Sequence, residues 1–299
     1  MNRLARAVMD QGVEVTGEER DTHDIALHLV KIRTKSSASH VVRLDGVYHN
    51  AAQDYKKRNA EIKKHVHRAH GVVYQGEFSQ QIATRYLGEV GVPTSAIPNG
   101  ADPLFYDDLD PWETEFTHNF VAVSRWRPHK RLGDIVKSFL LADIPDSCLW
   151  VVGDLKDSGF GWKRYRDNSK LRFLGYLDQK SIGSLYRSCR ASLHLCWIDC
   201  CPNSVIESLA AGTPVICNNI GGTPALVRKA GGIICDIDAP YDLRPVKLYK
   251  PPGIDREIVA QAFHTVIEEK IDVNRKRVSI HHTASAYIEL FNKVLQRGM

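Results

Sequence analysis

Short apolar runs rich in β-branched residues alternate with longer segments of helical period along most of the chain. In the first third we expect strands at residues 13–16, 24–32, 40–46 and 71–75, and helices at 51–70 and 77–88. Further on we expect strands at 119–126, 148–154, 171–177, 191–197, 214–218 and 231–236, helices at 131–142 and 179–189, and a terminal helix at 283–295. Strands followed by helices in this way are typical of an α/β fold with mostly parallel sheets.

A change of composition at residues 101–116 divides this pattern into two parts. The segment "ADPLFYDDLDPWETEF" contains two prolines and many acids but no apolar period, which is typical of a linker. With 299 residues, the chain is long enough for two compact units. We therefore expect a short Rossmann-like domain at residues 1–105, a linker at 106–117, a second Rossmann-like domain at 118–278 and a C-terminal helix at 279–299 that packs back on the first domain.

Composition excludes several classes of protein. The net charge of +5, with 25% charged residues, suits acidic small molecules or an anionic membrane surface but is too weak to indicate nucleic acid. Seven cysteines, an odd number without zinc-knuckle spacing, indicate reduced thiols. No apolar run reaches the length of roughly 18 residues that a spanning helix needs. We expect a cytoplasmic protein, with peripheral contact at a membrane surface left open.

A helix with an unusual start follows the strand at 191–197. Residues 198–201 then form a loop at the carboxyl end of this strand, Pro202 suits the first helical turn, and Gly212 suits the left-handed end of the helix. The backbone N–H groups of Asn203 and Ser204 would point back toward the loop and offer an anion site. Glu207, about one turn further in, could accept from two neighbouring hydroxyls. An anion beside a diol describes a nucleotide, although an ordinary helix with a solvated Glu fits the residues equally well.

The residues around this helix resemble a known signature. "DCCPNSVIESLAAGTPVI" is similar to the motif of family 4 of the retaining glycosyltransferases, E-G-F-G-x-x-x-x-E followed by A-x-G-x-P-V-I. "VAVSRWRPHKRLGDIVKSF" resembles that family's GR-x-x-P-x-K-G segment, with Arg125 and Lys130 at the family spacing. "LRFLGYLDQKSIGSLYRSCRASLHL", "GVVYQGEFSQQI" and "AIPNGADPLF" resemble further family segments in the same order. The resemblance covers residues 68–235 strongly and the remainder weakly.

The resemblance implies a GT-B architecture, in which two Rossmann-like domains face each other across a cleft. The C-terminal domain would hold a UDP- or GDP-linked sugar, and the N-terminal domain would hold a glycan, lipid-linked or other hydroxyl acceptor. Transfer would retain the anomeric configuration and need no metal or other cofactor. Arg125 and Lys130 would be catalytic, because two fixed cations can stabilise the leaving phosphate. Arg131 is the second choice for the position of Lys130 if the register is off by one. Asp199, the third expected catalytic residue, would contact the transferred sugar.

The resemblance also assigns the remaining site residues. Donor binding would involve Gly153, Tyr176, Leu177, Pro202, Asn203, Ser204, Val205 and Glu207, with the last on the ribose. The acceptor side would include Asp45, which takes the place of a family His, together with Tyr48 and His49. A structural turn role for Asp45 is equally open. The first domain lacks the family's first strand and its Gly-rich turn, so we expect a reduced domain. A homodimer that completes the sheet edge is an open alternative.

Several other signals indicate less. The triplets "DLD" at 108–110 and "DID" at 236–238 resemble a metal motif of another glycosyltransferase fold but are common by chance. The histidines of "HVHRAH" lie on different helix faces, which favours a solvated surface over a metal site. The basic helix at 51–70 is a solvated face or a contact for anionic lipid. A nucleotide-sugar-binding protein with little catalysis stays the alternative function, whereas the lack of G-x-G-x-x-G after any strand disfavours a dinucleotide oxidoreductase.

Overall fold

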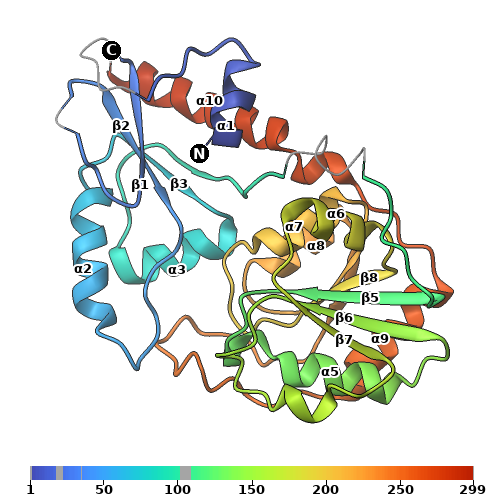
Figure 1. Cartoon of the computed structure of the whole chain (residues 1–299). Helices are drawn as coiled ribbons and strands as arrows, with labels where there is room; N and C mark the ends of the chain where they lie inside the picture. Colours follow the sequence, from blue (N-terminus) through green and yellow to red (C-terminus); the bar gives the residue numbers. More distant parts are fainter. Residues whose placement is uncertain (1, 18–22, 35, 102–108, 299) are drawn as a thin grey trace. The chain divides into compact units, whose positions relative to one another are not determined.

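The computed structural model of the chain describes residues 2–17, 23–34, 36–101 and 109–298. The chain forms two compact units (Figure 1). Unit 1 comprises Met1–Gly100, Asp242–Val246 and Ser279–Met299, and unit 2 comprises Ala101–Tyr241 and Lys247–Val278. The units thus divide at Gly100 rather than at residue 105, and the short segment 242–246 belongs to unit 1.

Unit 1 contains a parallel sheet with helices on both faces (Figure 1). Its described elements are α1 (Asn2–Met9), β1 (Ile25–Leu29), β2 (Ser39–Leu44), α2 (Tyr55–Val66), β3 (Gly71–Tyr74), α3 (Glu77–Leu87), β4 (Thr94–Ala96) and α10 (Ile280–Gly298), with strand order β1-β2-β3-β4. Side chains alternate between the two faces: Val42 and Val72 pack toward α2 and α3, whereas Val41 and Val73 pack toward α10. The C-terminal helix therefore completes the core of unit 1 although it follows unit 2 in the chain.

The strand expected at residues 13–16 is wrong. Val13–Thr16 form no helix or strand, and within the described residues no strand pairs with them. Val13 instead packs against the cluster that α1 forms with α10, and Val15 is exposed. An alternation of β-branched residues over four positions is too short to specify a strand without a neighbouring edge to pair with.

Unit 2 contains the larger parallel sheet. Its elements are β5 (His118–Val123), η1 (Pro128–Lys130), α5 (Leu132–Ala142), β6 (Ser147–Val152), η2 (Trp162–Tyr165), β7 (Leu171–Gly175), α6 (Gln179–Arg187), β8 (Ala191–His194), α7 (Asn203–Ala210), β9 (Val215–Asn218), α8 (Thr223–Ala230), β10 (Gly232–Cys235), α9 (Arg256–Glu268) and η3 (Arg275–Val278). One face carries α5 and α9 over Phe120 and Leu149; the other carries α6, α7 and α8 over Val121 and Trp150 (Figure 1). The sequence analysis missed α9.

The strand order of unit 2 creates a crevice at one edge of its sheet. The order is β10-β9-β8-β5-β6-β7, and every described pair of neighbouring strands is parallel. The chain runs outward from β5 through β6 to β7, then returns to the other side of β5 with β8. Where the order reverses, the loops that follow the two central strands diverge and leave room for a ligand. The described part of the expected linker, residues 109–117, has no regular structure but packs on this unit through Trp112 and Phe116.

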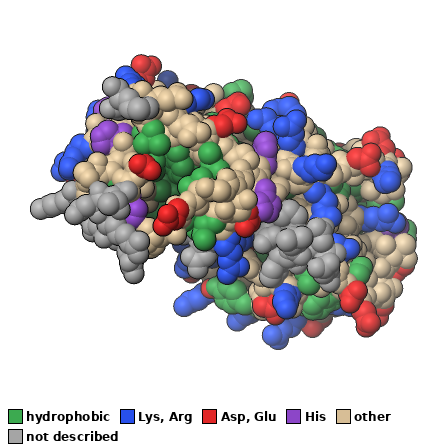
Figure 2. Space-filling view, turned by 90° about the horizontal axis from the view of Figure 1, so that it is seen from above, with side chains coloured by type: hydrophobic (Ala, Val, Ile, Leu, Met, Phe, Trp, Pro, Cys, Tyr) green, Lys and Arg blue, Asp and Glu red, His purple; other side chains and the backbone are tan. Residues whose placement is uncertain are grey.

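On the face drawn in Figure 2, Lys and Arg side chains lie interspersed with Asp and Glu and form no continuous basic stripe among the residues drawn in colour. All seven cysteines are free thiols, and five of them are buried. Within the described ranges, no helix has the length and apolarity required to cross a membrane.

Candidate functional site

A pocket of about 440 Å³ lies at the carboxyl ends of the central strands of unit 2. Four connections line it: those that follow β5, β6, β7 and β8. The lining residues are Val123, Ser124, Arg125, Lys130, Val152, Gly153, Tyr176, Leu177, Ile182, Asp199, Cys201, Pro202, Asn203 and Ser204. The pocket therefore occupies the crevice at which the strand order reverses.

The connection after β5 holds two cations at the pocket. Trp126 is buried and its indole Nε1–H donates to the backbone oxygen of Val152 at 2.9 Å, which ties this loop to the end of β6. Arg125 remains exposed beside it. The short helix η1 then brings Lys130 into the lining of the pocket. In the same helix, the backbone carbonyl of His129 accepts a hydrogen bond from the N–H of Trp197 at 2.8 Å. This last bond joins the loops that follow β5 and β8.

Arg131 does not belong to the pocket. Its side chain is 0% exposed, and its guanidinium donates to both carboxylate oxygens of Asp238 at 2.6 and 2.7 Å. The residue has a left-handed backbone, with φ of 54°, so the chain turns sharply between η1 and α5. Lys130 and Arg131 consequently point to different environments. Arg131 as the second choice for a catalytic cation is therefore wrong, because a fully buried, paired guanidinium cannot reach a ligand.

Lys130 and Asp199 form an ion pair within the pocket lining. The ammonium donates to Oδ2 of Asp199 at 2.5 Å, and the side chains are 17% and 21% exposed. Burial alone would lower the pKa of Lys130, but the neighbouring Cys196 and Asp199 outweigh it, so this pKa lies above its usual value. Burial likewise opposes the charge of Asp199, and Lys130 reverses that effect and lowers the pKa of the carboxyl. Both groups are charged at neutral pH.

Two glycines allow the loops of the pocket to approach one another. Gly153 has φ of +112°, and a Cβ there would lie 1.9 Å from the backbone oxygen of Ser124. The sequence analysis assigned this glycine to donor binding; the structure shows that it allows two segments of the chain to pass close to each other. Gly222 donates its N–H to the backbone oxygen of Asp199 at 2.7 Å, and a Cβ there would meet Cys200. The glycine turn before α8 thus supports the loop that carries Asp199.

The amino-terminal end of α7 faces the pocket. Pro202 is the N-cap rather than a first-turn residue, with φ of −71° and ψ of 123°, and no described side chain caps the helix there. Pro202, Asn203 and Ser204 all line the pocket, so the positive end of the helix dipole lies at its wall. At the other end, Gly212 adopts the left-handed conformation, with φ of 86°, that the sequence analysis expects.

The other expected donor residues differ in their positions. Tyr176 is 75% exposed and lines the pocket together with Leu177. Val205 is 1% exposed and packs in the core between α7 and the sheet, so it does not reach the pocket. Glu207 is half-buried one turn along α7 and is not among the lining residues. Its assignment to a ribose stays a prediction.

The expected acceptor residues lie in unit 1. Asp45 follows β2, with a half-exposed side chain that pairs with Arg43 at 3.0 Å and accepts from Gln75 at 3.3 Å. The ring of Tyr48 lies under the guanidinium of Arg58, 4.8 Å from its centroid. Burial lowers the pKa of His49, whose Nδ1 lies 3.2 Å from the backbone oxygen of Val47. Their role toward an acceptor stays a prediction.

Two residues beside the pocket were missed by the sequence analysis. His194 at the end of β8 and Cys196 just after it are buried, and both contact the Lys130–Asp199 pair electrostatically. Burial first, and then Lys130, lowers the pKa of His194 to about 3, while burial raises the pKa of Cys196 to about 12. Both are therefore neutral at pH 7. The stretch "HLCWID" contains both residues and Asp199, but it reads as the end of an ordinary buried strand, so the sequence analysis did not single it out.

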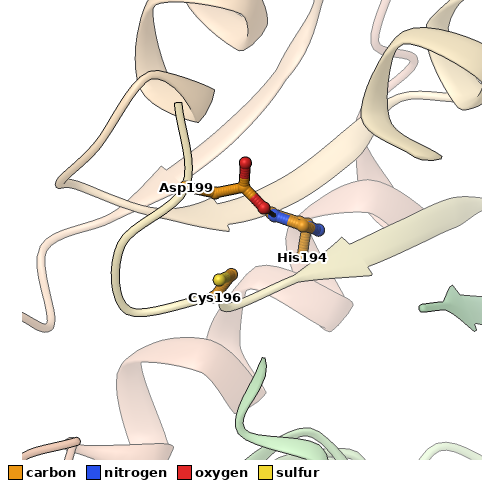
Figure 3. A group of neighbouring side chains, drawn as sticks. All are labelled: His194, Cys196 and Asp199. Carbon is orange, nitrogen blue, oxygen red and sulfur yellow. Dashed lines mark ion pairs between the residues drawn. The ribbon is translucent and has the colours of Figure 1, made fainter. Parts of the chain in front are cut away.

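Together with Asp199, these two residues form a cluster of side chains of the types that bind metals. Among the residues that the structure describes, His194, Cys196 and Asp199 are the group whose ligand atoms all lie within 4.8 Å of one another (Figure 3).

The motifs that the sequence analysis discounted lie elsewhere. Asp238 of "DID" forms an ion pair with Arg131, and "DLD" begins outside the described residues. In the basic helix, His65 faces Glu61, whereas His67 hydrogen-bonds the backbone oxygen of Leu87.

The segment that contains the pocket is similar to a known protein family. Residues 115–243 match the family described as "Glycosyl transferases group 1". The matched residues include all fourteen that line the pocket, so the matched segment contains the complete candidate site. No curated protein matches the chain significantly.

Solved structures extend the likeness to nearly the whole chain. A sucrose-phosphate synthase (tll1590) from Thermosynechococcus elongatus is 18% identical, with a TM-score of 0.61 over 88% of this chain and 67% of that chain. Alr3699/HepE from Anabaena, solved in complex with UDP and glucose, is 17% identical, with a TM-score of 0.60 over 98% of this chain and 79% of that chain. At such identities the likeness shows the fold alone. The GT-B fold class is therefore confirmed, whereas membership of family 4 in particular stays a prediction.

Proposed function

We propose that the protein transfers a sugar from a nucleotide-diphosphate sugar to a hydroxyl acceptor, with retention of configuration and without a metal. The observation that carries this proposal is the pocket in the glycosyltransferase segment, where Arg125, Lys130 and the start of α7 converge. Two cations and a helix N-terminus in one lining favour a diphosphate, because each stabilises negative charge. The complexes of Alr3699/HepE with UDP and with UDP-glucose support UDP as the first donor to test.

The pocket residues suggest how such a donor is held. The diphosphate binds between the guanidinium of Arg125 and the amides at the start of α7, with Tyr176 at the exposed rim available to stack on the base. Asp199 accepts from hydroxyls of the transferred sugar, and Glu207 from those of the ribose. In the structure Lys130 is paired with Asp199, so donor binding requires the ammonium to exchange part of this contact for the diphosphate.

The chemical step then depends on charge and position. As the bond between the anomeric carbon and the diphosphate breaks, negative charge grows on the leaving oxygen, and Arg125 and Lys130 stabilise it there. The leaving phosphate accepts the proton of the attacking hydroxyl, so attack occurs on the face from which the diphosphate departs and configuration is retained. No protein nucleophile is required, and the enzyme accelerates the step mainly by holding the two reactants in line.

Binding and turnover test the proposal with matched variants. Calorimetry with UDP, GDP and their sugars should give binding to the wild type, and Arg125→Met should weaken it by about tenfold or more, since a hydrogen bond to a charged group contributes about 1.5–3 kcal/mol. Arg127→Met is the control: it removes a charge from the same loop, but Arg127 pairs with Tyr249 outside the lining. Lys130→Met should lower turnover of a hexosyl acceptor by orders of magnitude. NMR of the product reports its anomeric configuration. Equal turnover in Lys130→Met and wild type would refute the catalytic assignment.

The alternative is a protein that binds a nucleotide sugar without turnover, as a partner subunit would. The Lys130–Asp199 pair favours it, because each residue already satisfies the other and neither is free for a reacting sugar. Tight binding of a nucleotide, together with no transfer to any acceptor and no hydrolysis of the donor, would select this alternative.

A further inference from the structure

We propose that His194, Cys196 and Asp199 form a binding site for a thiophilic divalent cation of the Zn²⁺ class. When the ion binds, it displaces Lys130 from its ion pair with Asp199. All three residues come from β8 and the loop that follows it, and Figure 3 shows the His194 ring and the Asp199 carboxylate pointing toward one another. Imidazole nitrogen, thiolate sulfur and carboxylate oxygen are the donors that zinc takes in proteins.

The ligand atoms are nearly in place for this ion. Tetrahedral zinc, with bonds of about 2.0–2.3 Å, separates its ligand atoms by roughly 3.3–3.6 Å. In the structure all three ligand atoms lie within 4.8 Å of one another, and Nε2 of His194 is 3.8 Å from Oδ2 of Asp199. The three atoms therefore need to close by roughly 1 Å, which rotation of the Cys196 and Asp199 side chains supplies.

A second observation points to a ligand at this position. His194 is only 5% exposed, and its buried Nε2 has no hydrogen-bond partner among the residues that the structure describes. An orphaned buried ring nitrogen is costly, by about 1–3 kcal/mol, unless something fills the position it faces. Asp199 lies in front of this nitrogen at a distance too long for a hydrogen bond. A metal ion between them satisfies both groups.

Charge balance explains why Lys130 must yield. The Lys130 ammonium now neutralises Asp199 and also contacts the thiol of Cys196. When the ion binds, Cys196 releases its thiol proton to solvent and becomes a thiolate, so two anionic ligands balance the doubly charged ion. The ion then repels the ammonium of Lys130, which turns into the pocket. Because Asp199 also lines this pocket, the metal ion can reach its site from there. A water from the pocket completes the fourth position.

Cobalt binding to the full-length chain tests the site without any assay of activity. After removal of metal with a chelator, Co²⁺ should bind once per chain and produce a thiolate-to-cobalt absorption band, and Zn²⁺ should displace it. Cys196→Ser should lose the band. Cys200→Ser is the matched control, because this neighbouring thiol is not in the ligand group, and it should keep the band. Absence of the band in the wild type, or its persistence in Cys196→Ser, would overturn the site.

The exchange with Lys130 has its own test. Lys130→Met removes the competing cation from Asp199, so the affinity for Co²⁺ should rise by about tenfold or more, the size of effect that neighbouring groups have on metal sites. Unchanged or weaker binding would overturn the exchange. Near-UV circular dichroism of each variant shows whether it is folded; should Cys196→Ser fail to fold, loss of the band in Asp199→Asn decides the assignment instead.

One consequence rests on the proposed function. A metal-bound Asp199 cannot accept hydrogen bonds from the donor sugar. The rate of sugar transfer with Zn²⁺, divided by the rate without it, should therefore be below one in the wild type and close to one in Cys196→Ser. An unchanged ratio in a metal-loaded wild type would refute this inhibition. If the chain transfers no sugar at all, the proposed function fails, whereas the cobalt band still decides the metal site.

Discussion

Replacement of Arg131 by Met is a sharp test of how the structure separates two adjacent cations. Arg131 and Asp238 have side chains that are 0% and 1% exposed, and two hydrogen bonds join them. Asn218 also donates to Asp238 at 2.9 Å. Arg131→Met leaves a buried carboxylate with an amide donor but no counter-charge. The left-handed backbone at this position disfavours Arg and Met alike, so the change isolates the ion pair.

Loss of one partner from a buried, hydrogen-bonded ion pair costs about 3–5 kcal/mol. This is a large share of the stability of a typical domain, about 5–15 kcal/mol. The double variant Arg131→Met/Asp238→Leu removes the stranded charge, so it should recover about 2 kcal/mol or more of the loss. The two changes are therefore strongly non-additive, as expected for residues in direct contact.

Urea unfolding followed by tryptophan fluorescence measures this effect in unit 2 alone. All five tryptophans of the chain, at positions 112, 126, 150, 162 and 197, belong to that unit. Arg125→Met is the control, because Arg125 is exposed, and it should change the free energy of unfolding by less than about 0.5 kcal/mol. A loss below about 1 kcal/mol in Arg131→Met, or no recovery in the double variant, would refute the structural role of the pair.

Two further predictions concern stability. Gly153→Ala should lower the free energy of unfolding of unit 2 by about 3 kcal/mol or more, because its Cβ would lie 1.9 Å from the backbone oxygen of Ser124; a change within about 1 kcal/mol in the same urea assay would contradict this. In unit 1, burial and then the neighbouring His40 lower the pKa of His28, so the unfolded chain binds more protons than the native one below pH 6.5 and stability should fall as the pH drops through this range. Hydrogen exchange of the backbone amides of β1 and β2 at pH 5 and pH 7, corrected for intrinsic exchange rates, should show this loss of stability, and His28→Gln should reduce it. An equal loss of stability in the wild type and the variant would exclude His28 as its source.

Much of the fold could be predicted from local patterns. Buried parallel strands are short apolar runs, and their helices carry an apolar stripe of period 3.6, so the order of strands and helices from residue 24 to residue 235 was readable apart from β4 and α8. Pattern failed where a partner decides the outcome. Residues 13–16 have the composition of a strand but no edge to pair with, and a four-residue alternation contains no information about neighbours.

The candidate site divides in the same way. The resemblance to glycosyltransferase motifs assigned Arg125, Lys130, Asp199 and residues 202–204 to the site, and all of them line the pocket at the carboxyl ends of parallel strands. The sequence alone could not separate Lys130 from Arg131, which are adjacent and carry the same charge. That separation depends on a left-handed turn and on Asp238, a residue distant in the chain.

His194 and Cys196 show the limit most clearly. In the sequence they occupy alternate positions of the strand expected at residues 191–197, and nothing local distinguishes them from core residues. Their chemistry arises because β8 pairs with β5, which brings the loop after β5, and with it Lys130, against them. The sequence by itself determined most of the segments that form strands, helices and the turns that line the pocket, since these depend on neighbours in the chain. Only the tertiary structure decided which charges meet, because strand order and burial depend on residues far apart in the sequence.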